Sequence, residues 1–216
     1  MFKTLARIFH KVSVVVIFLL LCLTACQKNG QLHERPNAFG QVLNGAATSK
    51  VRIEVFSDLQ CPACRNLFLN IIQPVMEEYQ DKVSVIYYEF PLNMHQYAYP
   101  AARYIAAAAE LGPQQVLSVY EAIFTDQPYW INDGNLEDSV SKALSTEDFL
   151  RVRQILRDEN SLAEINKKIE KEQSLGRRRG VKSTPTLFIS YSGKEEKIEG
   201  ALSYQVIKLF LDPVLK

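Results

Sequence analysis

The sequence predicts an α/β fold in which a helical segment separates two groups of strands. Residues 51–92 show a strand–helix–strand pattern, residues 93–180 show only helical patterns, and residues 181–216 show a β-hairpin followed by a helix. Apolar residues that alternate mark the strands, and apolar residues that recur every three or four positions mark the helices. The strands of the first unit are expected to be parallel, with a right-handed crossover. The helical segment is therefore interpreted as an insertion into an α/β domain.

The first unit begins with a strand over residues 51–56, which alternate and are rich in β-branched and aromatic side chains. A helix with one broad apolar face follows. This face consists of Leu67, Phe68, Ile71, Ile72, Val75, Met76 and Tyr79. Pro74 is expected to kink or break the helix near Gln73, because proline lacks the N–H that a helix interior needs. A second strand is expected over residues 83–90, and Pro91 ends it.

The inserted segment is expected to consist of successive helices. They cover residues 100–111, 113–124 and 136–144, with further helices after Ser145 and Ser161. A loop that holds Pro128, Trp130 and Gly134 is expected between the second and third of them. Ser145 is a candidate helix cap, and Ser161 with Glu164 resembles a capping box, in which serine accepts a backbone N–H of the first turn.

The C-terminal part returns to β-structure. A strand over residues 186–190, a turn over residues 192–194 and a strand over residues 196–199 form the expected hairpin. Gly200 separates this hairpin from a final amphipathic helix. Near the other end of the domain, residues 42–43 are candidates for a short edge strand.

Residues 1–25 have the features of a targeting segment. Lys3, Arg7 and Lys11 form a basic region, and the apolar stretch after them is about 12 residues long, whereas a transmembrane helix needs roughly 20. The segment ends before Cys26 in a motif that resembles the lipobox of bacterial lipoproteins, which implies cleavage before Cys26 and its lipidation. The alternative is an uncleaved membrane anchor. In either case the domain is expected to lie outside the cytoplasmic membrane.

Removal of this segment leaves a nearly neutral chain. The full sequence has 25 basic and 24 acidic residues; three basic residues leave with the segment, so the net charge becomes −2. This balance gives no indication of nucleic-acid binding. Residues 26–49 are polar and are expected to form a flexible tether, which leaves residues 50–92, 93–180 and 181–216 as parts of one domain.

The candidate redox site lies at the first strand-to-helix turn. With Cys22 removed and Cys26 lipidated, Cys61 and Cys64 are the thiols that remain. Pro62 suits the first helical position, so Cys61 is expected at the helix cap, exposed and facing unpaired backbone N–H groups. The positive end of the helix dipole stabilises a thiolate there. Cys64 lies one turn further on and can close a disulfide with Cys61.

These features resemble the DsbA-like branch of the thioredoxin superfamily, from residue 51 to the C-terminus. The resemblance is carried by Cys61-Pro62-Ala63-Cys64 after a strand, by the helical insertion, and by Gly180-Val181-Lys182-Ser183-Thr184-Pro185-Thr186 before the hairpin. It implies a thioredoxin fold and a cis proline at position 185 beside the cysteines. The backbone of Thr184 would then be free to bind an extended substrate segment. The alternative is a trans proline that begins a strand.

The chemistry implied is thiol–disulfide exchange without a cofactor. Cys61 would form a mixed disulfide with a client, and Cys64 would resolve it. Well-known oxidases of the family have histidine between the cysteines, whereas this chain has Ala63. Because alanine supplies neither charge nor a side-chain hydrogen bond, a less depressed Cys61 pKa and a weaker oxidant are expected.

Other candidate residues are less specific. Glu54 lies on the strand before the site, where related proteins keep a buried acid that helps move the proton of the resolving cysteine. The alternative is a solvent-facing glutamate paired with a base. Asp58 is a candidate to cap or brace the active-site loop, and His95 could begin the insertion near the site or serve only a structural role.

Three functions follow as hypotheses. The first is a lipid-anchored, monomeric oxidase of exported proteins that a quinone-linked membrane partner reoxidises. The second is a reductase that a membrane electron donor keeps reduced. The third is a metal-binding lipoprotein, although two cysteines with only His33 and His95 elsewhere are a poor set for tetrahedral zinc.

Overall fold

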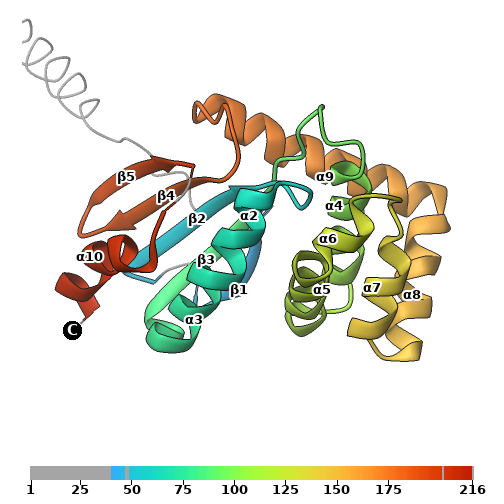
Figure 1. Ribbon diagram of the computed structural model, residues 1–216, viewed down its shortest axis with the longest axis horizontal. Coiled ribbons are helices and arrows are strands. Elements are labelled where there is room, and N and C mark those ends of the chain that lie inside the picture. The colour runs from blue at the N-terminus through green and yellow to red at the C-terminus, as the bar shows by residue number, and fades with distance from the viewer. Residues whose placement is uncertain (1–39, 47–48, 201, 216) are drawn as a thin grey trace, which may run out of the picture. The chain divides into compact units, whose positions relative to one another are not determined.

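The computed structural model describes residues 40–46, 49–200 and 202–215 (Figure 1). Its contacts divide the chain into two units, and the described residues belong to the second, Pro36–Lys216. The predicted signal segment, Cys26 and most of the predicted tether lie outside the described residues. Among the described residues, no helix is long and apolar enough to cross a membrane.

The strands within the described ranges form one sheet in the order β1-β3-β2-β4-β5. They are β1 (Gln41–Asn44), β2 (Val51–Ser57), β3 (Val83–Glu89), β4 (Thr186–Tyr191) and β5 (Lys194–Glu199). β2 and β3 are parallel, as the strand–helix–strand pattern predicts, and β4 pairs antiparallel with β2. β1 is the short edge strand expected near residues 42–43 and pairs antiparallel with β3. This topology places the start of the active-site helix at the C-terminal end of the central strand β2.

The regular α-helix after β2 is interrupted just before Pro74, near the expected position, but the chain stays helical there. α2 (Pro62–Leu67) passes into a π-helical segment, η1 (Phe68–Ile72), and then into α3 (Gln73–Tyr79), which a short 3₁₀ turn, η2 (Gln80–Lys82), ends. Pro74 lies in the first turn of α3. The wider π turn just before it shifts the hydrogen-bonding register, so Pro74 occupies a position where its missing N–H is tolerated.

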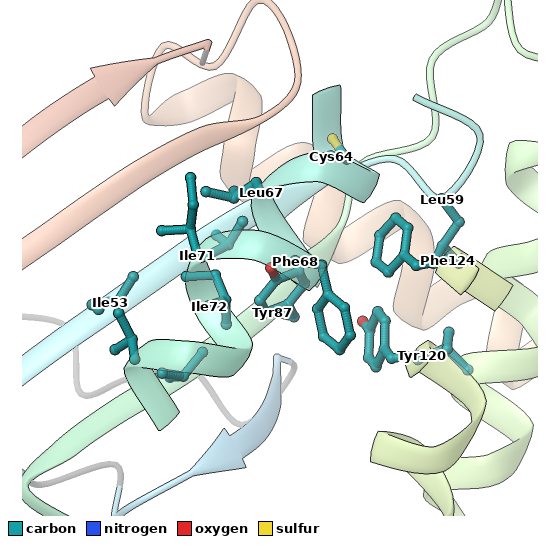
Figure 2. Close-up of a cluster of buried hydrophobic side chains, with 14 of the residues drawn as sticks. Ile53, Leu59, Cys64, Leu67, Phe68, Ile71, Ile72, Tyr87, Tyr120 and Phe124 are labelled. Carbon is teal, nitrogen blue, oxygen red and sulfur yellow. The ribbon is translucent and has the colours of Figure 1, made fainter. Parts of the chain in front are cut away.

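One face of the sheet carries the main hydrophobic core. The helical segment from α2 to α3 and the final helix α10 (Tyr204–Leu215) pack on this face. Figure 2 shows Cys64 and the apolar side chains below it on the helix, with Ile53 and Tyr87 of the strands facing them. Phe68 stacks on Phe124 with ring centroids 5.0 Å apart, which joins the active-site helix to the insertion.

The opposite face of the sheet packs against the end of the insertion. Phe56, Tyr88 and Phe188 lie there with Leu175 and Val181. A Cβ atom on Gly176 would come within 2.6 Å of the ring of Phe90, so glycine allows the helix to approach the sheet closely. The long helix α9 (Glu159–Arg178), orange in Figure 1, thus connects the inserted helices to this face.

The insertion is helical, as predicted. It comprises α4 (Ala98–Ala109), α5 (Pro113–Thr125), α6 (Gln127–Trp130), α7 (Leu136–Ala143), α8 (Thr146–Arg157) and α9. The loop expected around Pro128 contains the helical turn α6, and the buried indole of Trp130 anchors it by donating to the Ile123 carbonyl at 2.7 Å.

The two predicted serine caps have different outcomes. Ser145 caps α8 as expected, since its hydroxyl accepts the Asp148 N–H at 3.1 Å. The prediction for Ser161 is wrong: α9 begins earlier, and the Asp158 carboxylate accepts the Ser161 N–H at 2.8 Å. Aspartate is an equally good cap, and its use here adds almost a turn to the start of the helix.

Candidate functional site

Cys61 and Cys64 lie at the junction of β2 and α2, and both are free thiols. Cys61 is the N-cap of α2, in an extended conformation, and Pro62 occupies the first turn. The expectation of an exposed Cys61 is wrong in degree, because only 8% of the residue is accessible. Its Sγ donates to the Thr184 carbonyl at 3.4 Å, and Gln127 contacts its carbonyl at 3.2 Å, so two neighbouring segments cover it.

The surroundings of Cys61 favour its thiolate. The side chain of Cys64 donates a hydrogen bond to it, and the backbone N–H groups of Cys64 and Ala63 add to this, so the pKa of Cys61 is lowered to about 6 although burial opposes the shift. Hydrogen bonds from the first turn of a helix are the contribution expected at a helix N-terminus. The fold therefore favours the nucleophilic thiolate of Cys61.

Cys64 has the opposite character. It is completely buried, and burial is the main reason that its pKa is raised well above the usual value for a thiol. The Asp58 N–H points at its Sγ, 3.5 Å away. The structure thus pairs Cys61, whose thiolate is favoured, with the buried Cys64, whose protonated thiol is favoured.

The segment that contains Pro185 lies beside Cys61, as the resemblance implied. The Thr184–Pro185 peptide bond is cis. The Thr184 carbonyl accepts the Cys61 thiol, whereas the Thr184 hydroxyl is buried and has no hydrogen-bond partner within the described chain. The Pro185 carbonyl accepts the Gly200 N–H at 2.9 Å, which ties the segment to the end of the hairpin.

Asp58 braces the active-site loop. Its carboxylate accepts the backbone N–H groups of Gln60 and Leu92, each at 2.7 Å, and lies 2.9 Å from His95 Nδ1. The residue is fully buried, whereas the side chain of His95 is partly exposed. Asp58 therefore joins the loop before Cys61 to the start of the insertion, and His95 is its partner there.

Gln127 is a site residue that sequence reasoning missed. Its side-chain amide donates to the carbonyls of Leu59 and Cys61, at 2.7 and 3.2 Å. It belongs to α6, where a loop was expected, and no local pattern in the sequence distinguishes it. Its contacts hold the insertion against the active-site turn.

Glu54 does not occupy the place that its predicted role requires. It is buried, but it lies on the sheet face of Phe56 and Tyr88, and the Tyr88 hydroxyl donates to it at 2.9 Å. Arg52 and Arg179 pair with it at 3.1 and 3.2 Å. Val55, the next residue, faces the core that contains Cys64. Because side chains alternate along a strand, a one-residue offset places Glu54 on the wrong face for a role beside Cys64.

Glu89 and Glu172 are buried acids that sequence reasoning also missed. Glu89 ends β3, and Glu172 lies on α9; both are at most 2% exposed. An acidic residue at the end of the mostly apolar strand over residues 83–90 was the available signal for Glu89. Within the described residues, no cluster of three or more potential ligands could hold a metal ion.

A family model and two curated relatives match most of this chain. The family model described as "Thioredoxin" matches residues 38–213. A curated relative named "Probable disulfide bond formation protein D" from Bacillus anthracis is 25% identical over 163 residues, which cover 68% of this chain and 68% of the relative. Its counterpart in Bacillus cereus is 24% identical over the same shares of the two chains.

Solved structures of related proteins have the same fold. The crystal structure of Wolbachia pipientis alpha-DsbA1 matches with a TM-score of 0.67 and 20% identity, over 83% of this chain and 92% of that one. Oxidised BdbD from Bacillus subtilis matches with a TM-score of 0.65 and 19% identity, over 81% and 91%.

The chain belongs to the thioredoxin family. Its sheet, active-site helix and helical insertion form the DsbA-type version of the thioredoxin fold. The class predicted from the sequence, a DsbA-like thiol:disulfide oxidoreductase, is therefore confirmed.

Proposed function

We propose that this protein is an oxidase that introduces disulfide bonds into exported proteins. The observation that carries the proposal is the unequal pair of thiols, with the pKa of Cys61 lowered to about 6 and that of Cys64 raised by burial. Whatever stabilises the Cys61 thiolate also stabilises the reduced protein, which makes the disulfide a stronger oxidant. A pKa of about 6 lies between roughly 3.5 for DsbA and about 7 for thioredoxin. We expect an oxidant weaker than the strongest members of the family.

The proposed reaction is a two-electron exchange in two steps. A client thiolate attacks Cys61 in the Cys61–Cys64 disulfide, and Cys64 leaves with the electron pair and takes up a proton. A second client thiolate then attacks the client sulfur of the mixed disulfide. The client gains a disulfide, and Cys61 leaves as the stabilised thiolate. Thr184 and Pro185 are proposed to bind the client backbone at this point, because Thr184 lies in contact with Cys61.

The proposed setting is extracytoplasmic, with the domain held at a membrane by lipid on Cys26. This part of the proposal is supported by the lipobox-like motif before Cys26 and by the name of the Bacillus anthracis relative, which refers to disulfide bond formation. A quinone-linked membrane partner would reoxidise the reduced protein. Metabolic labelling with a radioactive fatty acid should label the wild-type chain and leave Cys26→Ser unlabelled.

The reduction potential of the Cys61–Cys64 pair tests the direction of the reaction. Equilibration in glutathione buffers, with alkylation and mass measurement, should give about −120 to −180 mV if the protein donates disulfides. A value of roughly −230 to −270 mV would instead support a reductase. Failure to form the disulfide, together with stoichiometric metal that Cys61→Ser removes, would favour the metal-binding hypothesis.

Pro185→Thr should lengthen the lifetime of mixed disulfides with clients. Cys64 can attack Cys61 only when the client sulfur, which is displaced, lies in the correct position beside Thr184. The segment before β4 defines that position. A disturbed segment misaligns the attack and slows resolution. Rapid acid quenching and separation of the mixed species would measure the lifetime.

Pro113→Thr provides the matched control for this measurement. Pro113 is exposed and lies at the start of α5. The contact of α5 with the active-site helix is at the other end, where the Phe124 carbonyl accepts a hydrogen bond from Arg65 of α2. Replacement of Pro113 should leave the lifetime unchanged. Equal lifetimes in wild type and Pro185→Thr would contradict a role for Pro185 in client binding.

A further inference from the structure

A run of three arginines ends α9 just before the segment that contacts Cys61. Arg177 and Arg178 are the last residues of the helix, and Arg179 is its C-cap. The chain then turns at Gly180, whose N–H donates to the Arg177 carbonyl at 3.0 Å, and reaches Thr184 four residues later. Because the Thr184 carbonyl accepts the Cys61 thiol, the arginines precede the wall of the redox site.

Packing fixes the end of α9 at the end of the sheet where the active-site helix begins. The Val181 N–H donates to the Gly176 carbonyl at 2.9 Å, which folds the loop back onto the helix. A Cβ atom on Gly176 would come within 2.6 Å of Phe90 and 2.9 Å of Phe56. Both rings belong to residues at or just beyond the C-terminal ends of β2 and β3. The basic run and Cys61 therefore lie at the same end of the sheet.

Arg179 has a structural role, and its charge is neutralised. Its guanidinium lies 3.6 Å from the ring centroid of Phe188. One guanidinium nitrogen is 3.2 Å from a carboxylate oxygen of Glu54, and another is 2.9 Å from one of Glu195. An arginine that stacks on the sheet and pairs with two acids contributes no net attraction for a partner.

Arg177, Arg178 and Lys182 differ from Arg179 in both respects. All three are exposed, and none forms an ion pair with a carboxylate in the part of the chain that the structure describes. Arg178 donates to the uncharged Ser174 hydroxyl at 2.9 Å. Residues 173–175, which lie three and four positions before the arginines, are uncharged, so no acid occupies the place of a helical ion-pair partner.

The helix dipole explains only part of this arrangement. Arginines in the last turn are favourable beside the negative end of α9. Lys182 lies outside the helix, two residues before Thr184, so their Cα atoms are at most about 7 Å apart. The acid nearest to it in effect, Glu199, is paired with Lys197, which lowers the pKa of Glu199 more than Lys182 does. Three exposed cations thus remain without a role in the fold.

We propose that Arg177, Arg178 and Lys182 form a docking surface for acidic client segments, which carry Asp or Glu within a few residues of the cysteine that meets Cys61. The six residues from Arg178 to Thr184 span at most about 20 Å. An extended client segment of that length, with its cysteine beside Thr184, places its neighbouring side chains along these cations. Charges at the rim of an interface raise the rate of association and its dependence on salt. The inference rests on the proposed exchange at Cys61 and names the clients that it favours.

The test compares two dithiol peptides that differ only in charge. One has glutamates on both sides of each cysteine, and the other has glutamines. Oxidised protein is mixed with each peptide, and two electrons pass from the peptide thiols to the Cys61–Cys64 disulfide while the protons go to the reduced cysteines and the buffer. Acid quenching and mass measurement give the two rate constants. Their ratio is divided by the same ratio for a small uncharged disulfide, which removes the effect of glutamate on thiol reactivity.

The double variant Arg177→Gln/Arg178→Gln should lower the acidic-to-neutral ratio about tenfold at low salt, the lower end of the enhancement from electrostatic steering. In 1 M salt, where charges are screened over about 3 Å, wild type and variant should give the same ratio. Arg151→Gln/Arg157→Gln is the matched control, because it removes two exposed arginines from α8, on the side of the insertion remote from the sheet (Figure 1). It should leave the ratio unchanged.

Lys182→Gln provides a second test that does not alter α9. It should lower the ratio by a smaller factor than the double variant does. An unchanged ratio in both folded variants, or an equal fall in the α8 control, would overturn the docking surface. If the wild type oxidises neither peptide, exchange at Cys61 is contradicted instead. Titration with an acidic peptide that lacks cysteine then decides: amide NMR signals of residues 177–184 should shift, and their constancy would overturn the docking surface.

Discussion

Cys64→Ser is expected to hold client proteins in stable mixed disulfides, whereas Cys61→Ser is expected to reduce exchange to the uncatalysed rate. Cys61 supplies the thiolate, stabilised by its position as the N-cap of α2. The buried Cys64 then attacks Cys61 in the mixed disulfide and releases the client. Without Cys64 the first attack proceeds and the second cannot, so the intermediate accumulates. Without Cys61 no accessible nucleophile is left at the site, because Cys64 is completely buried.

The measurement is electrophoresis of extracytoplasmic extracts without reducing agent, after acid trapping. Cys64→Ser should give a ladder of high-mass species that disappears on reduction, and Cys61→Ser should give none. Pro113→Thr is the control, since Pro113 is exposed at the start of α5 and both thiols stay in place. It should resemble the wild type. A ladder of equal intensity in Cys61→Ser would contradict the assignment of the nucleophile.

The parts of the fold that could be predicted are those whose signals are local. Alternation over residues 51–56 and the helical spacing from Leu67 onward defined the strand and helix on either side of Cys61. The position of Cys61 as N-cap follows from the same local pattern, since Pro62 favours the first helical turn. Local signals thus located the chemistry of the site.

The parts that could not be predicted depend on contacts between distant segments. Glu54 was assigned because related proteins keep a buried acid on this strand, yet side chains alternate between the two faces of a strand, and Val55 faces the cysteines instead. Gln127 and Glu172 reach the site region only because α6 and α9 pack against it. Nothing within a few residues of either side chain encodes that packing.

The buried ionisable groups lead to a second large expected effect: the free energy of unfolding should fall with rising pH more steeply in the oxidised protein than in the reduced protein. The pKa of Glu89 is raised from 4.5 to about 8, so between these values the folded protein binds a proton that the unfolded chain has released. The free energy of unfolding therefore falls as pH rises, by about 1.4 kcal/mol per pH unit for one proton. Glu172, whose pKa is also raised, acts in the same direction.

Cys61 opposes this trend, and it does so in the reduced protein alone. Its pKa is lowered from 9.0 to about 6, so between these values the unfolded chain binds a proton that the folded protein has released. Stability from this group rises by about 1.4 kcal/mol per pH unit and is lost as pH falls through about 6. In the oxidised protein Cys61 has no proton to exchange, so Glu89 and Glu172 alone determine how the free energy of unfolding changes with pH.

Urea unfolding at intervals from pH 5 to pH 9, with and without reductant, measures both effects. The oxidised protein should lose stability steadily up to about pH 8, and the reduced protein should gain on it by about 1.4 kcal/mol per unit above pH 6. The double variant Cys61→Ser/Cys64→Ser, which lacks both thiols, should follow the slope of the oxidised protein, and Glu89→Gln should flatten that slope. Parallel curves for the two redox states would mean that the Cys61 thiolate is not stabilised by the fold. The physical basis for an oxidising disulfide would then be absent, because the stability that the thiolate gives to the reduced protein is the same free energy that drives transfer of the disulfide to a client.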